Sequence, residues 1–186
     1  NQISKALLGY QKILSFDPCN QQLVIEIAKL YSELNRVSEA IEMYIGILNM
    51  NIGYYALDDY NREPSMKNFP DFEWSELNIL AELYYKSGQY QNGLITIKQT
   101  ARWLQNRNDE TFWDKLQNDS EFDARRFENP EFRKISADKQ QRPYELPIDI
   151  KIKLGLFRLR CNNPKEASIH FEALLSENDI EEFQDL

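Results

Sequence analysis

The sequence contains few residues that break, bend or cross-link a fold. Its 186 residues include only 6 glycines, 7 prolines and 2 cysteines. So little glycine and proline excludes a collagen or a low-complexity chain, and two cysteines are too few for a disulfide scaffold. No apolar run approaches the roughly 18 residues of a membrane-spanning helix, and the first residues carry no signal-peptide apolar core. The opening residues, Asn-Gln-Ile-Ser-Lys, lack an initiator Met, which predicts an internal segment of a longer protein.

Basic residues are also scarce relative to acidic ones. The chain has 22 Lys and Arg against 30 Asp and Glu, a formal net charge of −8. Binding to DNA phosphates needs clustered Lys and Arg side chains, so we expect contact with DNA only indirectly, through a complex. We also expect no membrane binding. Cys19 and Cys161 have no partner at metal-ligand spacing. We interpret them as packed small hydrophobes in a reducing compartment.

What the sequence does contain is a repeat whose period is about 34 residues, a length typical of helix-turn-helix repeats. A small residue is followed by an aromatic residue four positions later and by an apolar one three positions after that. The pairs separated by one full period are Ala6 and Ala40, Tyr10 and Tyr44, and Ile13 and Ile47. This period predicts a helix-turn-helix repeat whose small residue lets two helices approach closely.

Apolar spacing places two helices within one unit of this repeat. Val24, Ile27, Ala28 and Tyr31 follow the i, i+3, i+4, i+7 pattern of a first helix. A loop at residues 35–38 and a second helix through the 40–47 trio then complete the unit. The same pattern recurs after residues 74 and 148.

Residues that begin and end helices agree with this spacing. Gly88 can adopt the left-handed conformation that closes a first helix. Asn163 and Pro164 offer an N-cap and a first helical residue. Pro18 stops the helix that begins the chain.

The period therefore predicts the organisation of the whole chain. We expect the second helix of a truncated repeat at 1–20, repeats at 21–54, 74–107 and 148–181, insertions at 55–73 and 108–147, and the start of a further element at 182–186.

This pattern resembles the tetratricopeptide repeat (TPR). The matching residues are Ala6, Tyr10, Pro18, Tyr31, Ala40, Tyr44, Tyr84, Leu154, Gly155, Ala167 and Phe171. The resemblance implies an all-α fold whose helix pairs form a right-handed superhelix, interrupted by the two insertions. Lys151, Arg158 and Gly93 depart from the TPR pattern.

In TPR arrays the first helices line a concave surface that binds partners. The residues at those positions here are Gln22, Ile25, Lys29, Ser32, Ser75, Asn78, Glu82, Tyr85, Ile152 and Leu156. The co-chaperone subclass grips a terminal carboxylate with Lys and Asn, which this chain lacks at the corresponding positions. We expect a groove for a mixed apolar and polar segment; the alternative is that each residue is plain helix surface.

The chain shows no sign of catalytic chemistry. Its only histidine, His170, has no Ser or Cys nucleophile pattern around it. No glycine-rich phosphate loop or Cys-x-x-Cys motif occurs. We expect no catalytic residue, no cofactor and no metal.

The second expected insertion, 108–147, mixes aromatic and charged residues. We expect it to fold against the array with Trp113 and Phe122 as anchors, while Arg125 and Arg126 pair with carboxylates. Solvated arginines are the alternative.

Two strings carry a more specific resemblance. "FEWSELNILAEL" at 72–83 and "FWD" with "DSEFDARR" between 112 and 126 resemble the TPR-array subunits of transcription factor IIIC. That resemblance implies a nuclear scaffold that binds the TFIIB-related and Bdp subunits of transcription factor IIIB and other transcription factor IIIC subunits. Such a scaffold helps assemble transcription factor IIIB upstream of RNA polymerase III genes such as tRNA genes. A generic TPR adaptor of the co-chaperone kind, and an RNA-processing enzyme built on helical repeats, remain as alternatives.

Overall fold

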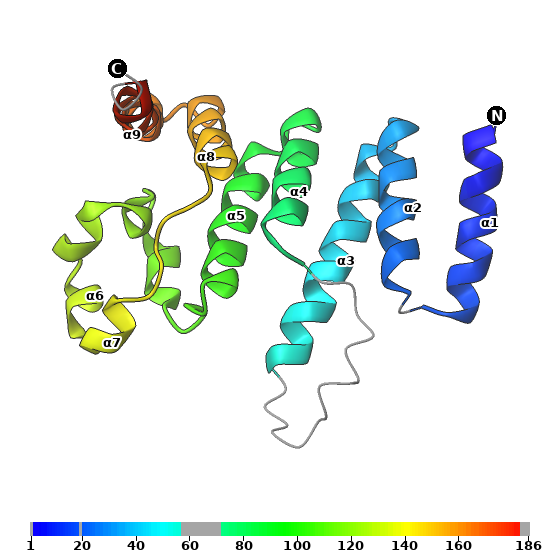
Figure 1. Ribbon diagram of the computed structural model, residues 1–186, viewed down its shortest axis with the longest axis horizontal. Helices are drawn as coiled ribbons and strands as arrows, with labels where there is room; N and C mark the ends of the chain where they lie inside the picture. Colours follow the sequence, from blue (N-terminus) through cyan, green and yellow to red (C-terminus); the bar gives the residue numbers. More distant parts are fainter. Residues whose placement is uncertain (1, 19, 57–71, 183–186) are drawn as a thin grey trace. The chain divides into compact units, whose positions relative to one another are not determined.

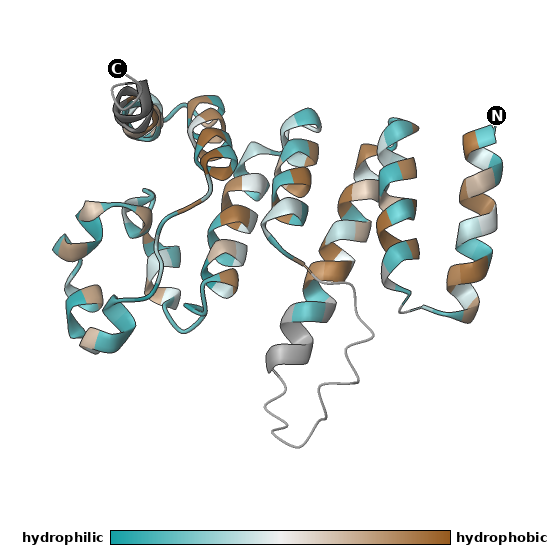
Figure 2. Ribbon diagram, in the orientation of Figure 1, coloured by the Kyte–Doolittle hydropathy of each residue, from teal (hydrophilic) through white to brown (hydrophobic). Residues whose placement is uncertain are grey.

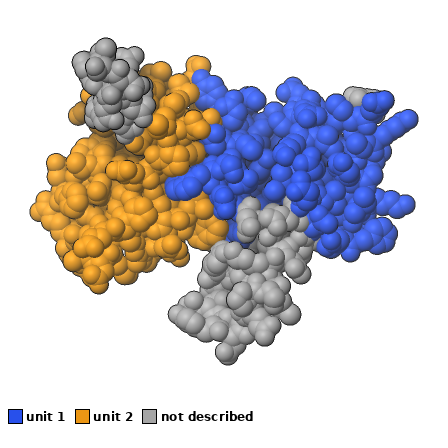
Figure 3. Space-filling view, viewed as in Figure 1, with its two compact units in different colours: residues 1–88 blue, residues 89–186 orange. Residues whose placement is uncertain are grey.

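The computed structural model describes residues 2–18, 20–56 and 72–182, and within these ranges all regular structure is helical (Figure 1). The all-α expectation is confirmed. The chain divides into two compact units, residues 1–88 and 89–186 (Figure 3). Among the described helices, none has the length and apolar character needed to cross a bilayer.

The described residues of unit 1 form four long helices that contact one another in chain order. They are α1 (Gln2–Phe16), α2 (Gln21–Glu33), α3 (Val37–Ala56) and α4 (Trp74–Lys86). Brown and teal alternate along α2 and α3 in Figure 2, as expected of helices with one buried face. Ala28 of α2 and Ala40 of α3 are completely buried. Small side chains at these positions allow the two helices to pack closely.

Side chains cap the starts of two of these helices. Asn20 accepts a hydrogen bond of 3.0 Å from the Leu23 backbone amide at the start of α2. Glu73 and Glu76 form a reciprocal capping box at the start of α4. Pro18 lies directly beyond the end of α1, as expected.

Four of the described helices are followed by a residue with positive φ. Asn35, Gly88, Asn106 and Asn162 have φ of 58°, 73°, 55° and 58°. The left-handed conformation predicted for Gly88 is confirmed. Asn35 reverses the chain so quickly that α3 already begins at Val37, inside the expected 35–38 loop. Asparagine tolerates this conformation better than other residues with a side chain.

Over residues 89–182, unit 2 is built from three long helices and a folded segment between the first two. The long helices are α5 (Tyr90–Leu104), α8 (Ile148–Arg160) and α9 (Pro164–Glu182), and α8 packs against the other two. The segment contains the 3-10 helices η2 (Thr111–Lys115), η3 (Ser120–Phe122) and η4 (Ala124–Glu128), and the short helices α6 (Pro130–Lys134) and α7 (Ala137–Gln140). We call residues 105–147 the insertion segment.

Two glycines of unit 2 lie against aromatic rings. A Cβ atom at Gly93 would stand 2.6 Å from the Phe157 ring, and one at Gly155 would stand 2.8 Å from the Phe171 ring. Gly93 departs from the alanine of the TPR pattern because the buried Phe157 ring occupies the space that a methyl group would need.

The long helices from α2 onward lie in pairs along the three expected repeats. Helices α2 and α3 begin and end near the limits of 21–54, although α3 continues to Ala56. Helices α4 and α5 fall within 74–107, and α8 and α9 occupy 148–182. Most of the expected 55–73 insertion and of 182–186 lies outside the described residues. The TPR assignment and its superhelical twist remain predictions.

Candidate functional site

The residues expected to line a partner-binding surface lie on α2, α4 and α8. Gln22, Lys29, Ser75 and Ile152 are exposed, and Ile25, Ser32, Asn78, Glu82, Tyr85 and Leu156 are half-buried. None of the ten is buried in the core. The α2 and α4 residues belong to unit 1, and Ile152 and Leu156 belong to unit 2.

The insertion segment has an aromatic core of its own. Trp113, Phe132 and Tyr144 are almost completely buried, and the Phe132 ring centroid lies 5.9 Å from that of Trp113 and 5.4 Å from that of Tyr144. Glu110 joins two of these rings, because its carboxylate accepts hydrogen bonds of 2.8 Å from Trp113 Nε1 and 2.7 Å from the Tyr144 hydroxyl. Phe122 is also buried.

A buried carboxylate, Asp119, connects the insertion segment to all three long helices of unit 2. Arg158 of α8 donates to it from Nε at 2.8 Å and from Nη2 at 2.5 Å. His170 Nε2 of α9 lies 3.0 Å from its Oδ2. Lys98 Nζ of α5 lies 3.6 Å from its Oδ1. One side chain of the insertion segment therefore holds α5, α8 and α9 at a single point.

A second buried carboxylate, Glu121, gathers three cations. Arg102 of α5 donates to both of its oxygens, at 3.0 and 3.1 Å. Lys98 and Arg107 approach it at 3.5 Å. Arg102 also pairs with Asp114. The cations of α5 are thus neutralised by carboxylates of the insertion segment, as burial of a charge requires.

A third connection runs from Arg125 to α9. Arg125 donates to both oxygens of Glu166, at 3.1 and 2.6 Å, and also pairs with Asp123. The backbone amide of Asp119 donates to Glu166 at 2.9 Å. We call the following ionisable groups of these three connections the ionic network: Lys98, Arg102, Arg107, Asp119, Glu121, Arg125, Arg158, Glu166 and His170.

The placement of Arg126 differs from the expectation. Arg125 contacts carboxylates, but Arg126 donates to the Asp123 backbone carbonyl at 2.9 Å. Its guanidinium lies 4.8 Å from the Phe127 ring centroid and 4.9 Å from that of Tyr144. The nearby carboxylates of Asp123 and Glu166 pair with Arg125. Arg126 instead makes cation–π contacts with the two aromatic rings.

Burial and ion pairing oppose each other in setting the carboxyl pKa values. Burial alone would raise the pKa of Asp119, but hydrogen bonds from Arg158 and His170 and the charges of Arg158 and Lys98 hold it far below its usual range. The pKa of Glu166 is lowered in the same way, because Arg125 outweighs burial. Burial raises the pKa of Glu121 despite the surrounding cations.

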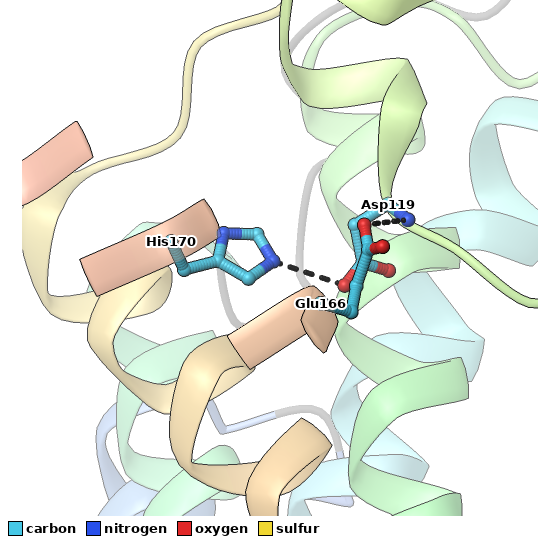
Figure 4. A group of neighbouring side chains, drawn as sticks. All are labelled: Asp119, Glu166 and His170. Atoms are coloured by element: carbon cyan, nitrogen blue, oxygen red, sulfur yellow. Dashed lines mark hydrogen bonds and ion pairs between the residues drawn. The ribbon is translucent and has the colours of Figure 1, made fainter. Parts of the chain in front are cut away.

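Asp119, Glu166 and His170 are close enough together to be considered as metal ligands (Figure 4). Their oxygens already face cations: both Asp119 oxygens accept from Arg158, and both Glu166 oxygens accept from Arg125. A divalent ion there would add charge beside two guanidinium groups. The cluster is therefore better suited to ion pairing than to metal binding. His170 is 7% exposed, so it is also a poor candidate for contact with a substrate.

Sequence reasoning expected carboxylate partners for Arg125 but missed the rest of the ionic network, whose partners lie between 14 and 51 residues apart along the chain. The available signal was the density of arginines and acids within an aromatic segment. The same pattern is also found on solvated surfaces.

The chain resembles a transcription factor tau subunit in each of two organisms over nearly its whole length. It is 35% identical to the transcription factor tau 131 kDa subunit of Saccharomyces cerevisiae, across 95% of the chain and 21% of that protein. It is 28% identical to the transcription factor tau subunit sfc4 of Schizosaccharomyces pombe, across 92% of the chain and 16% of that protein. No protein-family model matches. The chain thus spans about a fifth of the length of these relatives or less, and the expected resemblance to a transcription factor IIIC subunit is confirmed.

Proposed function

We propose that this chain, homologous to part of the tau 131 kDa subunit, is a protein-binding segment of a scaffold in the RNA polymerase III transcription machinery. In this role it helps transcription factor IIIC recruit and assemble transcription factor IIIB upstream of genes such as tRNA genes. The observation that carries the proposal is the resemblance across 95% of the chain, which includes both the helices and the insertion segment.

The described residues support a binding role over a catalytic one. Both relatives are named as transcription factor subunits. The ionic network is internally paired, and it fixes the insertion segment to α5, α8 and α9. A segment held in this way presents a constant surface, which lowers the entropic cost of binding a partner.

The proposed partners are the TFIIB-related and Bdp subunits of transcription factor IIIB, together with other transcription factor IIIC subunits. The net charge of −8 favours basic protein segments and disfavours DNA phosphates. Contact with DNA would therefore be indirect, and the site of action would be the nucleus.

The test is retention of nuclear proteins on the immobilised chain. We expect subunits of transcription factors IIIB and IIIC among the bound proteins, identified by mass spectrometry, and direct binding when purified transcription factor IIIB subunits are applied. Retention of chaperones alone would instead support the generic adaptor. Retention of neither class would contradict the scaffold proposal.

Point substitutions suit this experiment better than removal of the insertion segment. Deleting 108–147 would deprive Lys98, Arg102 and Arg158 of their carboxylate partners and of the segment that packs against them. A loss of binding would then report unfolding. We expect Ile152→Lys on α8 to weaken retention. The matched control is Leu175→Lys on α9, a more exposed apolar residue outside the expected surface, which should leave retention unchanged.

A further inference from the structure

A small cavity of about 210 Å³ opens on unit 2 between α5, the insertion segment and Arg158 of α8. Three aliphatic side chains contribute to its wall: Leu94, Ile95 and Leu116. Ile95 is 45% exposed, so part of this apolar surface faces solvent. The volume is below the roughly 300–1,000 Å³ of pockets for drug-sized ligands and matches a single inserted side chain.

The side chains of three glutamines line this cavity. Gln91 and Gln99 lie on the exposed side of α5, and Gln117 follows η2. Within the described residues, none of these three side-chain amides is hydrogen-bonded. Each therefore offers a carbonyl oxygen to a donor that enters the cavity.

The most exposed charged group in the wall of this cavity is the carboxylate of Asp114. Lys98 and Arg158 line it, but their side chains are 9% and 7% exposed and are already paired with Asp119. The Asp114 side chain is 42% exposed. Its Oδ1 accepts from Arg102, whereas its Oδ2 has no hydrogen-bond partner among the described residues.

We propose that this cavity binds a lysine or arginine side chain from a basic segment of a partner protein. The aliphatic stem of that side chain would pack on Ile95 and Leu116, and its charged head would reach Asp114 Oδ2 and the glutamine carbonyls. This inference rests on the proposed scaffold function. It places the contact with a basic partner segment at a surface other than the ten residues expected to bind partners.

The insertion segment supplies the parts of the cavity that a plain helical repeat would lack. Asp114, Leu116 and Gln117 all belong to it. Its position beside α5 is fixed by the Arg102 contacts with Glu121 and Asp114. The negative field of a chain with net charge −8 would increase the encounter rate of a basic segment, and salt would reduce that rate.

The first test uses two short probes with the complete ¹⁵N-labelled chain. The capped pentapeptide Ac-GLRLG-NH₂ is titrated in NMR experiments, and Ac-GLELG-NH₂ serves as the charge-reversed probe. We expect the arginine peptide to shift the amide signals of Gln91, Ile95, Gln99 and Gln117, with an affinity about fivefold above that of the glutamate peptide, as for a partly exposed ion pair. Equal affinities, stronger binding of the glutamate peptide, or shifts elsewhere only would overturn the proposal.

A matched pair of substitutions locates the binding. Ile95→Lys places a positive charge at the cavity rim, and Ile79→Lys makes the same charge change at a similarly exposed residue of α4. We expect Ile95→Lys to abolish the shifts at the glutamines and Ile79→Lys to preserve them. An equal effect of the two substitutions would show that net charge alone attracts the peptide, and would overturn the proposal.

Failure of this inference can be separated from failure of the scaffold proposal. Retention of transcription factor subunits by an Ile95→Lys chain that no longer binds the arginine peptide would overturn the cavity as a partner site and leave the scaffold function standing. Loss of the TFIIB-related or Bdp subunit from the Ile95→Lys chain, but not from the Ile79→Lys chain, would support both.

Discussion

The Asp119 carboxylate holds the Arg158 guanidinium by two hydrogen bonds, 2.8 and 2.5 Å long, across 39 residues of sequence. Asp119 lies in the insertion segment and Arg158 in α8, so the bond joins an irregular segment to a regular helix. Both side chains are buried. Charged hydrogen bonds of this kind are stronger than neutral ones, and removing one partner leaves the other as an uncompensated buried charge.

We therefore expect Asp119→Asn to destabilise unit 2 by about 3–5 kcal/mol, the cost of breaking a buried pair. Asparagine keeps the shape of the side chain but no longer neutralises Arg158 and Lys98. Urea unfolding, followed by circular dichroism and tryptophan fluorescence, measures the change. Glu131→Gln removes an exposed pair with Lys134 and should cost less than about 1 kcal/mol. Equal costs for the two variants would contradict a stabilising role for the network.

The lowered pKa values of Asp119 and Glu166 predict a loss of stability in acid. Their contribution is fully present above the ordinary carboxyl pKa of about 4 and is lost as the pH falls toward their lowered folded values. Glu121, whose pKa is raised, gains stability as the pH falls, but it is a single group opposing both Asp119 and Glu166. We expect the free energy of unfolding to fall from about pH 4 to about pH 2, and to fall less steeply in Asp119→Asn. Parallel pH profiles would argue against this assignment.

The contact between Gly93 and Phe157 predicts an unusual response to alanine. Alanine normally favours a helix over glycine by about 1 kcal/mol, and Gly46→Ala in α3, where no atom lies within 4 Å of the new Cβ, should be stabilising. Gly93→Ala would instead bring a methyl group to 2.6 Å from the Phe157 ring and should cost about 1–3 kcal/mol through overpacking. Thermal denaturation of both variants tests this. A gain in melting temperature for Gly93→Ala would show that Phe157 can move aside.

Tyr44 should tolerate the loss of its hydroxyl group. The side chain is 1% exposed, and the hydroxyl has no hydrogen-bond partner among the described residues. Because an unpaired buried polar group costs about 1–3 kcal/mol, we expect Tyr44→Phe to be neutral or stabilising in denaturant unfolding. A loss above about 1 kcal/mol would indicate a hydrogen-bond partner.

The same tyrosine should make unit 1 sensitive to alkali. Burial, with the charges of Glu76 and Glu26, raises the pKa of Tyr44 to about 12. A raised pKa means that its contribution is fully present below the ordinary pKa of about 10 and is lost as the pH rises through 12. The difference in stability between the native chain and Tyr44→Phe should therefore grow above pH 10. A constant difference across this range would contradict the raised pKa.

The sequence was most informative where structure depends on neighbouring residues. The repeat spacing located Ala40 and Tyr44 on a helix whose buried face they share, and the Asn163-Pro164 pair marked the start of α9. These signals are local, because a helix repeats its face every few residues and its ends are capped by adjacent side chains. The resemblance drawn from the strings between 72 and 126 was confirmed by the comparisons with known proteins.

Apart from the carboxylate pairing expected for Arg125, the ionic network could not be predicted, because no local pattern tells which distant charges will meet. Lys98, Asp119 and His170 are bound together although they come from three separate elements, with 51 residues between Asp119 and His170 alone. A charged residue in an amphipathic segment is most often solvated. Only the three-dimensional position of the insertion segment turns Arg102 and Arg158 into buried, paired groups.

The position of Asp119 also determines the order in which unit 2 can be completed during synthesis. Helix α5, with Lys98 and Arg102, leaves the ribosome first, and the carboxylates of the insertion segment follow. Arg158 and His170 emerge last. In an ordinary repeat array each unit can fold against its neighbour as it appears. Here Asp119, which pairs with Lys98 of α5, gains its remaining partners Arg158 and His170 only after α8 and α9 have been made. We therefore expect unit 2 to complete its folding only when its last helix is present.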